Sequence, residues 1–298
     1  MTRMFYREYP PPAVLKENVQ CFWALEHDYR DPIHTHEHLW ADTQIELIFS
    51  YGEPYYRRIS GARERLPKNF VIGPFKKELL LYSDGLTGFV AVRFHPWGFA
   101  AFSKRKMTEL INMIVPAEDV VGELPSMPAF PSPAGVHVEM KLEIIGNWLI
   151  RRLSEQQEKT SPVPEIARAV KVRKGVVKIS ELSDEFGLNP RQLERLFMRE
   201  VGMSAKLFAR ILRFNHAKGL IERDPGISLA GLTYESGYAD QAHFSHNFRE
   251  LFGYTPAEFK TLMRGWKEKM AGAPDDERPD DEPPDGERPD VVFLQDKP

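Results

Sequence analysis

The amino-acid sequence predicts an α+β protein in which a β-rich N-terminal domain precedes an all-α C-terminal domain. Short apolar runs bounded by Gly, Pro and Asp fill residues 1–100, a pattern that is typical of strands. Between residues 178 and 264 the apolar residues recur at helical spacing, and one helical pattern occurs twice. The chain has 298 residues, which is long enough for two domains.

Strands are predicted in the N-terminal domain wherever an apolar run lies between two turn sequences. The runs are 44–51, 70–72, 79–82 and 88–94. Several short strands at this spacing indicate a small barrel or sandwich. Residues 100–113 then follow a helical pattern, and a Pro-rich connector covers 124–135.

The C-terminal repeat consists of a helix, a turn centred on Gly, and a second helix. Gly187 recurs as Gly237 after 50 residues, and Phe197 recurs as Phe248 after 51, so the second turn holds one extra residue. This is the helix-turn-helix pattern, whose second helix enters the major groove of DNA. The sequence therefore predicts two units of a DNA reader.

Capping residues predict where these helices begin. Asn189 is a good N-cap, and Pro190 suits the first helical position. Asp240 is the predicted cap of the matching helix in the second unit. Residues 204–221 form a spacer helix between the units, and Thr255-Pro-Ala-Glu258 is a capping box that opens a closing helix.

These residues resemble a known family. The run from Leu182 through Gly187-Leu-Asn-Pro-Arg-Gln-Leu-Glu-Arg-Leu-Phe197, followed by Gly237-Tyr-Ala-Asp-Gln-Ala-His-Phe-Ser245 and Phe252-Gly-Tyr-Thr-Pro256, is similar to the DNA-binding domain of AraC/XylS transcription regulators. The resemblance implies double-stranded DNA as a partner, and RNA polymerase as a second partner if the protein activates transcription.

The resemblance also implies which side chains contact DNA. Arg191, Glu194 and Arg195 would face the bases, and Gln192 would lie near a phosphate. Arginine pairs with guanine, glutamate accepts from cytosine, and glutamine suits adenine. The full set of expected DNA-contacting residues is Asn189, Arg191, Gln192, Glu194, Arg195, Asp240, Gln241, Ala242, His243, Ser245 and His246.

The N-terminal domain resembles the cupin-like sensory domains of such regulators, through Glu46-Leu-Ile-Phe49 and Val92-Arg-Phe-His-Pro-Trp-Gly98. That implies a small-molecule effector. If the strand continued past Pro96, alternate residues would line a pocket with apolar walls and a few polar groups. The candidate ligand-binding residues are Trp23, Trp40, Glu46, Arg93, His95 and Trp97. The alternative is that the tryptophans are core residues and that Arg93 pairs with an acid such as Glu46.

A histidine-rich stretch, His34-Thr-His-Glu-His38, has three interpretations. It is an exposed polar loop or strand, the rim of a ligand pocket, or a metal site completed by Glu46. The last would make the protein a cupin-like metalloenzyme with an accessory DNA-binding domain. The leading interpretation is a regulator without catalytic residues, bound metal or cofactor.

We expect four parts along the chain: a sensory domain (1–153), a linker (154–162), a DNA-binding domain (163–270) and an acidic, disordered tail (271–298). The distribution of charged residues supports this division. Residues 163–270 hold 18 Lys and Arg against 13 Asp and Glu, whereas the tail holds 3 against 10. Only the helical domain therefore has the net positive charge that phosphate contact requires.

Three further features of the sequence concern the oligomeric state, the single cysteine and the location in the cell. The helix expected at 138–153 fits two placements equally, pairing with its copy in a homodimer or packing on the β-rich domain. Cys21 is the single cysteine and lies in an apolar strand, which favours a buried structural role over that of a methyl acceptor in DNA repair. No apolar run is long enough to span a membrane, so we expect a cytoplasmic protein with no membrane partner.

Overall fold

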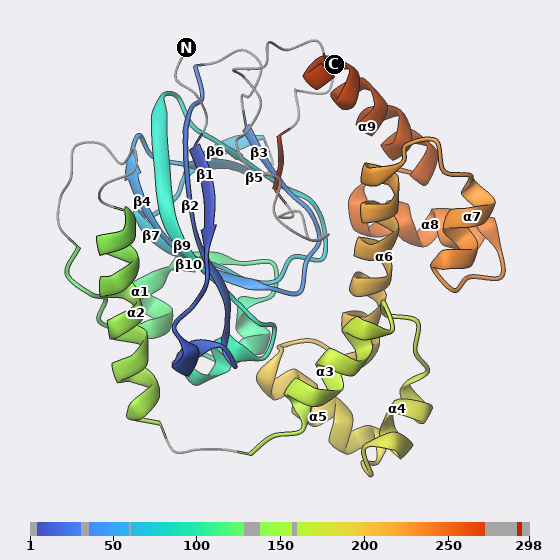
Figure 1. The fold of residues 1–298 in the computed structure, drawn as a ribbon, viewed down its shortest axis with the longest axis horizontal. Helices are drawn as coiled ribbons and strands as arrows, with labels where there is room; N and C mark the ends of the chain where they lie inside the picture. The colour runs from blue at the N-terminus through green and yellow to red at the C-terminus, as the bar shows by residue number, and fades with distance from the viewer. Residues whose placement is uncertain are drawn as a thin grey trace.

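A computed structural model describes residues 5–30, 36–59, 61–127, 138–156, 160–271 and 291–293. Two antiparallel sheets make up the N-terminal domain, and a helical domain lies beside them (Figure 1). Helix α6 stands between the sheets and the second helix-turn-helix unit. The fold class is the one the sequence predicts, a β-rich domain followed by a helical one.

The two sheets differ in the length of their strands. The first runs in the order β1 (Phe5–Tyr9), β2 (Val19–Asp28), β9 (Leu86–Phe94), β4 (Ile45–Gly52), β7 (Asn69–Ile72) and β10 (Ile114–Pro116). The second runs in the order β11 (Val291–Phe293), β3 (His36–Leu39), β8 (Leu79–Tyr82), β5 (Tyr56–Ile59) and β6 (Ala62–Arg65). Strands β4, β7, β8 and β9 confirm the four runs predicted from the sequence.

The first sheet is covered on both faces. Side chains such as Trp23, Ile48 and Phe89 pack with Leu81 and Tyr55 to form the core between the two sheets. On the opposite face the sheet packs against short helices and α2. These helices are η1 (Ala13–Leu15), η2 (Gly98–Ala101), η3 (Met107–Leu110), α1 (Ala117–Val121) and α2 (Val138–Ser154). Alternate strand residues face each core, as strand geometry requires.

Helix α2 packs on the N-terminal domain, which is one of the two placements expected for it. Its residues Ile145 and Leu149 are fully buried in the core beneath the first sheet. The helical segment predicted at 100–113 is wrong, because only the 3-10 turns η2 and η3 form there. Between them the Ser103 hydroxyl bonds to the backbone of Arg105, which competes with helical hydrogen bonding.

The helical domain contains both predicted units. Its helices are α3 (Val163–Val172), α4 (Ile179–Glu185), α5 (Pro190–Glu200), α6 (Ala205–Arg223), α7 (Leu229–Glu235), α8 (Gln241–Phe252) and α9 (Pro256–Ala271). They share one core, in which Phe208, Ile211 and Phe214 of the spacer helix α6 lie fully buried or nearly so. The two units are therefore joined by a common core as well as by the chain.

Two residues of the N-terminal domain, Trp40 and Ala41, belong to that same helical core. The ring of Trp40 packs edge-on against Phe252, Tyr254 and Phe259. A second junction joins Glu17 to Arg168 of α3 by an ion pair. Both domains thus form one packed unit in this structure.

At the end of the chain, residues 291–293 pair antiparallel with β3. Without β11, β3 would be an edge strand with unpaired backbone groups, and a Val-Val-Phe segment has a high tendency to add to such an edge. These three residues lie within the segment 271–298 that was expected to be a disordered tail. The rest of the tail, 272–290 and 294–298, lies outside the described residues, as does much of the Pro-rich connector.

Candidate nucleic-acid interface

The first recognition helix, α5, begins at a complete capping box. The Asn189 side chain accepts a hydrogen bond from the Gln192 backbone N–H, and the Gln192 side chain accepts one from the Asn189 N–H, both at 2.9 Å. Pro190 occupies the first helical position, where no N–H is needed. Both features confirm the predicted start of the helix and fix the direction in which its first turn points.

One face of α5 is buried and the other faces solvent. Leu193 and Phe197 lie in the helical core, at 1% and 0% exposure. Arg191, Glu194 and Arg195 are exposed. Among the described residues, neither arginine forms an ion pair. Two cations without a carboxylate partner therefore stand next to a helix N-terminus, which is a favourable arrangement for phosphate and guanine.

Gln192 has a structural role that the family pattern did not indicate. Its side-chain oxygen is held by the Asn189 N–H, so only the amide NH₂ group is available to a phosphate. Sequence reasoning missed this use, although a Gln three residues after an Asn cap is the signature of a capping box.

The second recognition helix, α8, begins at Asp240, as predicted. The Asp240 carboxylate accepts from the N–H groups of Ala242 and His243 at 3.1 and 3.0 Å. Gln241, Ala242, His243 and His246 are exposed, whereas Ser245 is half-buried. The first two turns of α8 therefore expose no Lys or Arg, and Arg249 follows in its last turn, whereas the first two turns of α5 expose two arginines.

The two units have the same backbone conformation at equivalent glycines, in addition to their similar sequences. Gly187 and Gly237 have φ of +64° and +66°, and Gly202 and Gly253 have +84° and +74°. These left-handed conformations favour glycine and turn the chain after each helix. Helix α6, capped by the Ser204 hydroxyl, holds the two units at a fixed separation. The two exposed helices α5 and α8 are therefore joined by one spacer helix.

The first unit also lies against the N-terminal domain. A Cβ added at Gly202, just after α5, would lie 2.5 Å from the Met107 carbonyl oxygen of η3. Helix α5 reaches η2 and η3 with its C-terminal part, while its first turn remains exposed. The contact thus leaves the expected reading face open.

Four of the six candidate ligand residues, Trp23, Trp40, Glu46 and Arg93, lie in hydrophobic cores or in an ion pair. Trp23 lies between the sheets at 1% exposure and Trp40 in the helical core at 2%. Arg93 donates from Nε to Glu46 Oε1 at 2.8 Å and from Nη1 to Glu8 Oε1 at 3.4 Å. The structure therefore has the tryptophans in cores and Arg93 paired with Glu46, the alternative that the sequence left open.

His95 and Trp97 are not on a strand, because β9 ends at Phe94. Pro96 has no N–H to continue the ladder, and the chain turns into η2. The two rings stack at a centroid separation of 4.9 Å and an angle of 7°. The Trp97 indole donates to the Glu17 carbonyl. The expectation that Arg93, His95 and Trp97 share one strand face is wrong, although Arg93 and Trp97 both reach the same interdomain cavity.

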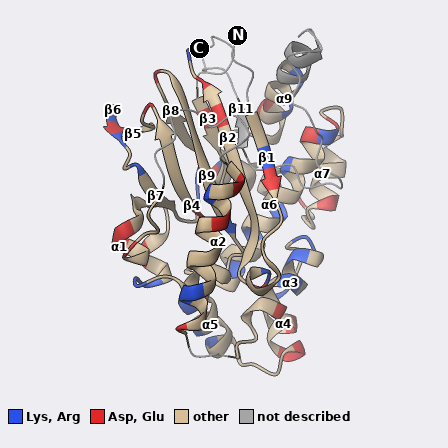
Figure 2. Ribbon diagram, turned by 60° about the vertical axis from the view of Figure 1, so that its left-hand side comes forward, with Lys and Arg blue, Asp and Glu red and all other residues tan. Residues whose placement is uncertain are grey.

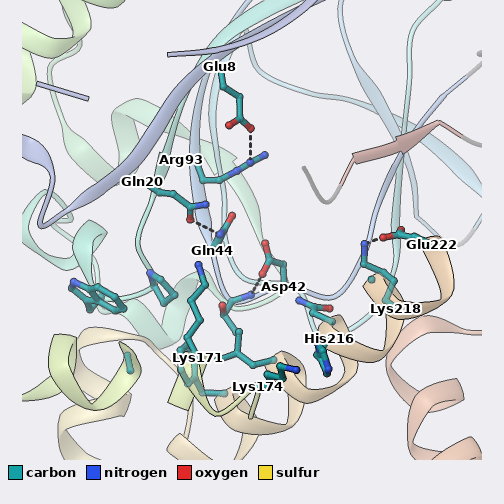
Figure 3. Close-up of a pocket in the computed structure, with 18 of the residues that line it drawn as sticks. Glu8, Gln20, Asp42, Gln44, Arg93, Lys171, Lys174, His216, Lys218 and Glu222 are labelled. Atoms are coloured by element: carbon teal, nitrogen blue, oxygen red, sulfur yellow. Dashed lines mark hydrogen bonds and ion pairs between the residues drawn. The ribbon is translucent and has the colours of Figure 1, made fainter. Parts of the chain in front are cut away.

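That cavity has a volume of about 570 Å³ and lies between the N-terminal domain and helices α3 and α6 (Figure 3). It is lined by Glu8, Gln20, Asp42, Thr43, Gln44, Arg93, Pro96, Trp97, Ala167, Lys171, Lys174, Phe208, Leu212, Asn215, His216, Lys218, Gly219, Glu222 and Arg223. Sequence reasoning missed the helical half of this set. The available signal was the cluster of polar residues at the C-terminal end of α6, which includes Asn215, His216 and Lys218.

The histidine-rich stretch is partly buried. His36 and His38 lie in β3 at 2% exposure, so the exposed-loop interpretation is wrong for them, while His34 lies outside the described residues. The His38 ring stacks on Trp40, and its Nε2 lies 3.0 Å from Glu78 Oε2. Within the described ranges, no group of three or more His, Cys, Asp and Glu side chains could hold a metal ion.

Cys21 lies in β2 at 7% exposure, beside Arg93. Burial raises the pKa of its thiol to about 12, which keeps it protonated at neutral pH. A buried, protonated thiol is a poor nucleophile. No helix among the described residues is long and apolar enough to cross a membrane.

Comparison with known proteins agrees with this arrangement. Residues 182–261 match a family described as a helix-turn-helix domain, and residues 7–116 match a domain of unknown function, DUF6597. The C-terminal part is thus a helix-turn-helix domain of the AraC type.

Two curated relatives each match about a quarter of this chain. The HTH-type transcriptional regulator GlxA of Rhizobium meliloti is 35% identical over 74 residues, which are 25% of this chain and 22% of the relative. The HTH-type transcriptional activator RhaS of Escherichia fergusonii is 32% identical over 79 residues, 26% of this chain and 28% of the relative. The match therefore spans less than a third of either relative.

Among solved structures, ToxT from Vibrio cholerae aligns with a TM-score of 0.43 and 9% sequence identity, over 87% of this chain and 98% of that chain.

Proposed function

We propose that the protein is a transcription regulator that reads promoter DNA with α5 and α8 and adjusts this reading through its N-terminal domain. The observation that carries the proposal is the pair of capped recognition helices, exposed on one spacer, with Arg191 and Arg195 unpaired within the described part of the chain. The charge distribution supports it, since Lys and Arg recur along α3 and its neighbours while α4 is acidic (Figure 2).

The proposed reading of DNA is unequal between the two units. Helix α5 offers two arginines, which attract phosphate and pair with guanine, whereas α8 offers an amide, a methyl group and two imidazoles. We therefore assign most of the affinity to α5, and the choice of register to α8. The site of action is the cytoplasm, where the promoter DNA of a bacterial regulator lies.

The N-terminal domain is the proposed sensor. Its Trp40 lies in the core that supports α8 and α9, and its η3 touches the segment after α5. A molecule that binds one docked arrangement more tightly than another would shift the populations of those arrangements. The contacts between the two domains therefore support control of DNA binding by a small-molecule effector. The proposal also includes a homodimer and a contact with RNA polymerase.

Selection of bound duplexes from a random DNA pool, with the full chain, tests the reading of DNA. We expect enriched sites made of two short motifs about 10 base pairs apart, because the two helices would enter successive turns of the major groove. Footprint length would show whether one copy or two occupy each site. A pool that shows no enrichment, or one motif alone, would contradict the two-helix reading.

A further inference from the structure

The interdomain cavity has walls of different chemistry. Helix α6 forms one wall from Phe208 to Arg223, and Lys171 at the end of α3 and Lys174 in the turn that follows add to it. The opposite wall comes from β1, β2, β9 and the segment that joins β3 to β4, where Gln20 lies beside Gln44 and Arg93 lies beside Glu8 (Figure 3). At about 570 Å³ the cavity is within the usual range for small-molecule sites.

The lining is positively charged. It contains five Lys or Arg (Arg93, Lys171, Lys174, Lys218, Arg223) and three Asp or Glu (Glu8, Asp42, Glu222). Arg93 bonds to Glu46 and Glu8, and Lys218 lies 3.1 Å from Glu222. Lys171 and Arg223 also interact with other residues. Lys174 forms no ion pair within the described residues. The excess positive charge is therefore concentrated on the side of the helical domain.

Neutral polar groups complete the other wall. The Gln44 amide donates to Gln20 Oε1 at 2.6 Å, and Thr43 lies next to them. On α6, Asn215 Oδ1 and His216 Nε2 are buried without a hydrogen-bond partner in the described structure. A buried polar atom without a hydrogen bond costs free energy. A polar ligand that formed hydrogen bonds with Asn215 and His216 would remove this cost and would therefore bind more tightly.

The state of His216 reflects the same excess of charge. Its pKa lies below the usual value, first because burial disfavours the imidazolium and then because Lys174 and Arg223 repel a third cation. An anion in the cavity would oppose that repulsion.

We propose that this cavity binds a small hydroxylated organic anion, a sugar-like carboxylate or phosphate ester, held between the amides of the N-terminal domain and the cations of α3 and α6. Lys174 would pair with the anionic group, and the glutamine amides with the hydroxyl groups. The ligand would contact both domains at once, so it would bind the docked arrangement more tightly than a separated one.

The consequence for DNA binding rests on the function proposed above. Helix α6 is both a wall of the cavity and the spacer that carries α5 and α8. A ligand that fixes α6 against the N-terminal domain would fix the position of both recognition helices. The cavity is thus the proposed place where an effector is linked to promoter reading.

Titration calorimetry on the full chain tests the site with gluconate, 6-phosphogluconate and the neutral polyol sorbitol as probes. We expect saturable binding of at least one anion below about 1 mM and none of sorbitol. Stronger binding of 6-phosphogluconate would indicate a phosphate ester, and stronger binding of gluconate a carboxylate. Lys174→Gln should weaken binding about tenfold or more.

Lys206→Gln is the matched control, since it removes an exposed lysine of α6 that lies outside the cavity, and it should leave affinity unchanged. The proposal is overturned if neither anion binds at about 1 mM, if sorbitol binds as well as the anions, or if Lys174→Gln binds like the unmodified protein. The titration contains no DNA, so its failure and a failure of DNA selection are separate results.

Discussion

The ring of Trp40 and the ring of Phe259 lie edge-on with their centroids 5.1 Å apart and an interplanar angle of 80°. One residue belongs to the N-terminal domain and the other to α9, so the two domains share an aromatic core. The neighbouring His38 ring stacks on Trp40 with the ring centroids 3.7 Å apart. This contact makes the docking of the two domains testable at a single side chain.

Trp40→Ala should separate the domains. Deleting a fully buried tryptophan costs about 3–5 kcal/mol, and here the loss falls at the junction between domains. We expect a larger radius of gyration in small-angle scattering and faster proteolysis between α2 and α3. Trp23→Ala is the control, because that tryptophan is buried between the sheets. Similar expansion in both variants would contradict a specific role for Trp40 in docking.

The helical domain could be predicted in detail from the sequence because its signals are local. Asn189 with Pro190, and Asp240 alone, mark helix starts within a few residues of chain. The role of Trp40 could not be predicted in this way, since it contacts residues more than two hundred positions away and leaves no periodic pattern.

The interdomain cavity escaped prediction for the same reason. Arg93 and Trp97 were selected from their alternation on an expected strand, yet they meet at the cavity because the chain turns after Phe94. The residues across the cavity, among them Lys174 and His216, lie in the domain that the sequence assigned to DNA binding alone. Only the docking of the two domains brings these groups together.

Arg195→Ala should weaken binding of the selected DNA site by about 1–3 kcal/mol and relax the preference at one base pair, because arginine pairs with guanine through two hydrogen bonds. A gel-shift series over single-base variants of the site measures both effects. Arg58→Ala removes an exposed arginine of β5 and should leave the affinity unchanged. Unchanged affinity and preference for Arg195→Ala would remove this residue from the interface.

A gel-shift series with Gln241→Ala measures the contribution of the second unit to DNA affinity, for comparison with that of the first. We expect a smaller loss than for Arg195→Ala, because a neutral amide attracts no phosphate and contributes only its own base contact. The slope of affinity against salt concentration should stay the same for Gln241→Ala. An equal or larger loss would place the main contribution to affinity in α8 instead of α5.

The equivalent glycines Gly187 and Gly237 should respond differently to alanine. Both have a left-handed backbone, in which alanine costs about 1–2 kcal/mol. Nothing lies within 4 Å of a Cβ at Gly187, whereas a Cβ at Gly237 would lie 2.6 Å from Val176 Cγ1. Chemical denaturation should therefore show a larger loss for Gly237→Ala. Equal losses would mean that the half-exposed Val176 moves aside.

Glu37 should make the stability of the N-terminal domain depend on pH. Burial raises the pKa of this carboxyl from 4.5 to about 8, although its hydrogen bond from Tyr29 acts in the opposite direction. The folded state therefore binds the Glu37 proton more tightly than the unfolded state does. Its contribution to stability is fully present below about pH 4.5 and is lost as the pH rises towards about 8.

Glu37→Gln removes this dependence, because the amide does not ionise and still accepts from Tyr29. The free energy of unfolding of the variant, measured by denaturant titration from pH 5 to 9, should rise relative to that of the unmodified protein by a few kcal/mol. Tyr29 and Tyr55 do not ionise in this range when folded, since burial raises the pKa of both. Glu109→Gln, at an exposed position of η3, is the control. Parallel curves for Glu37→Gln and the unmodified protein would show that Glu37 is ionised in the folded state.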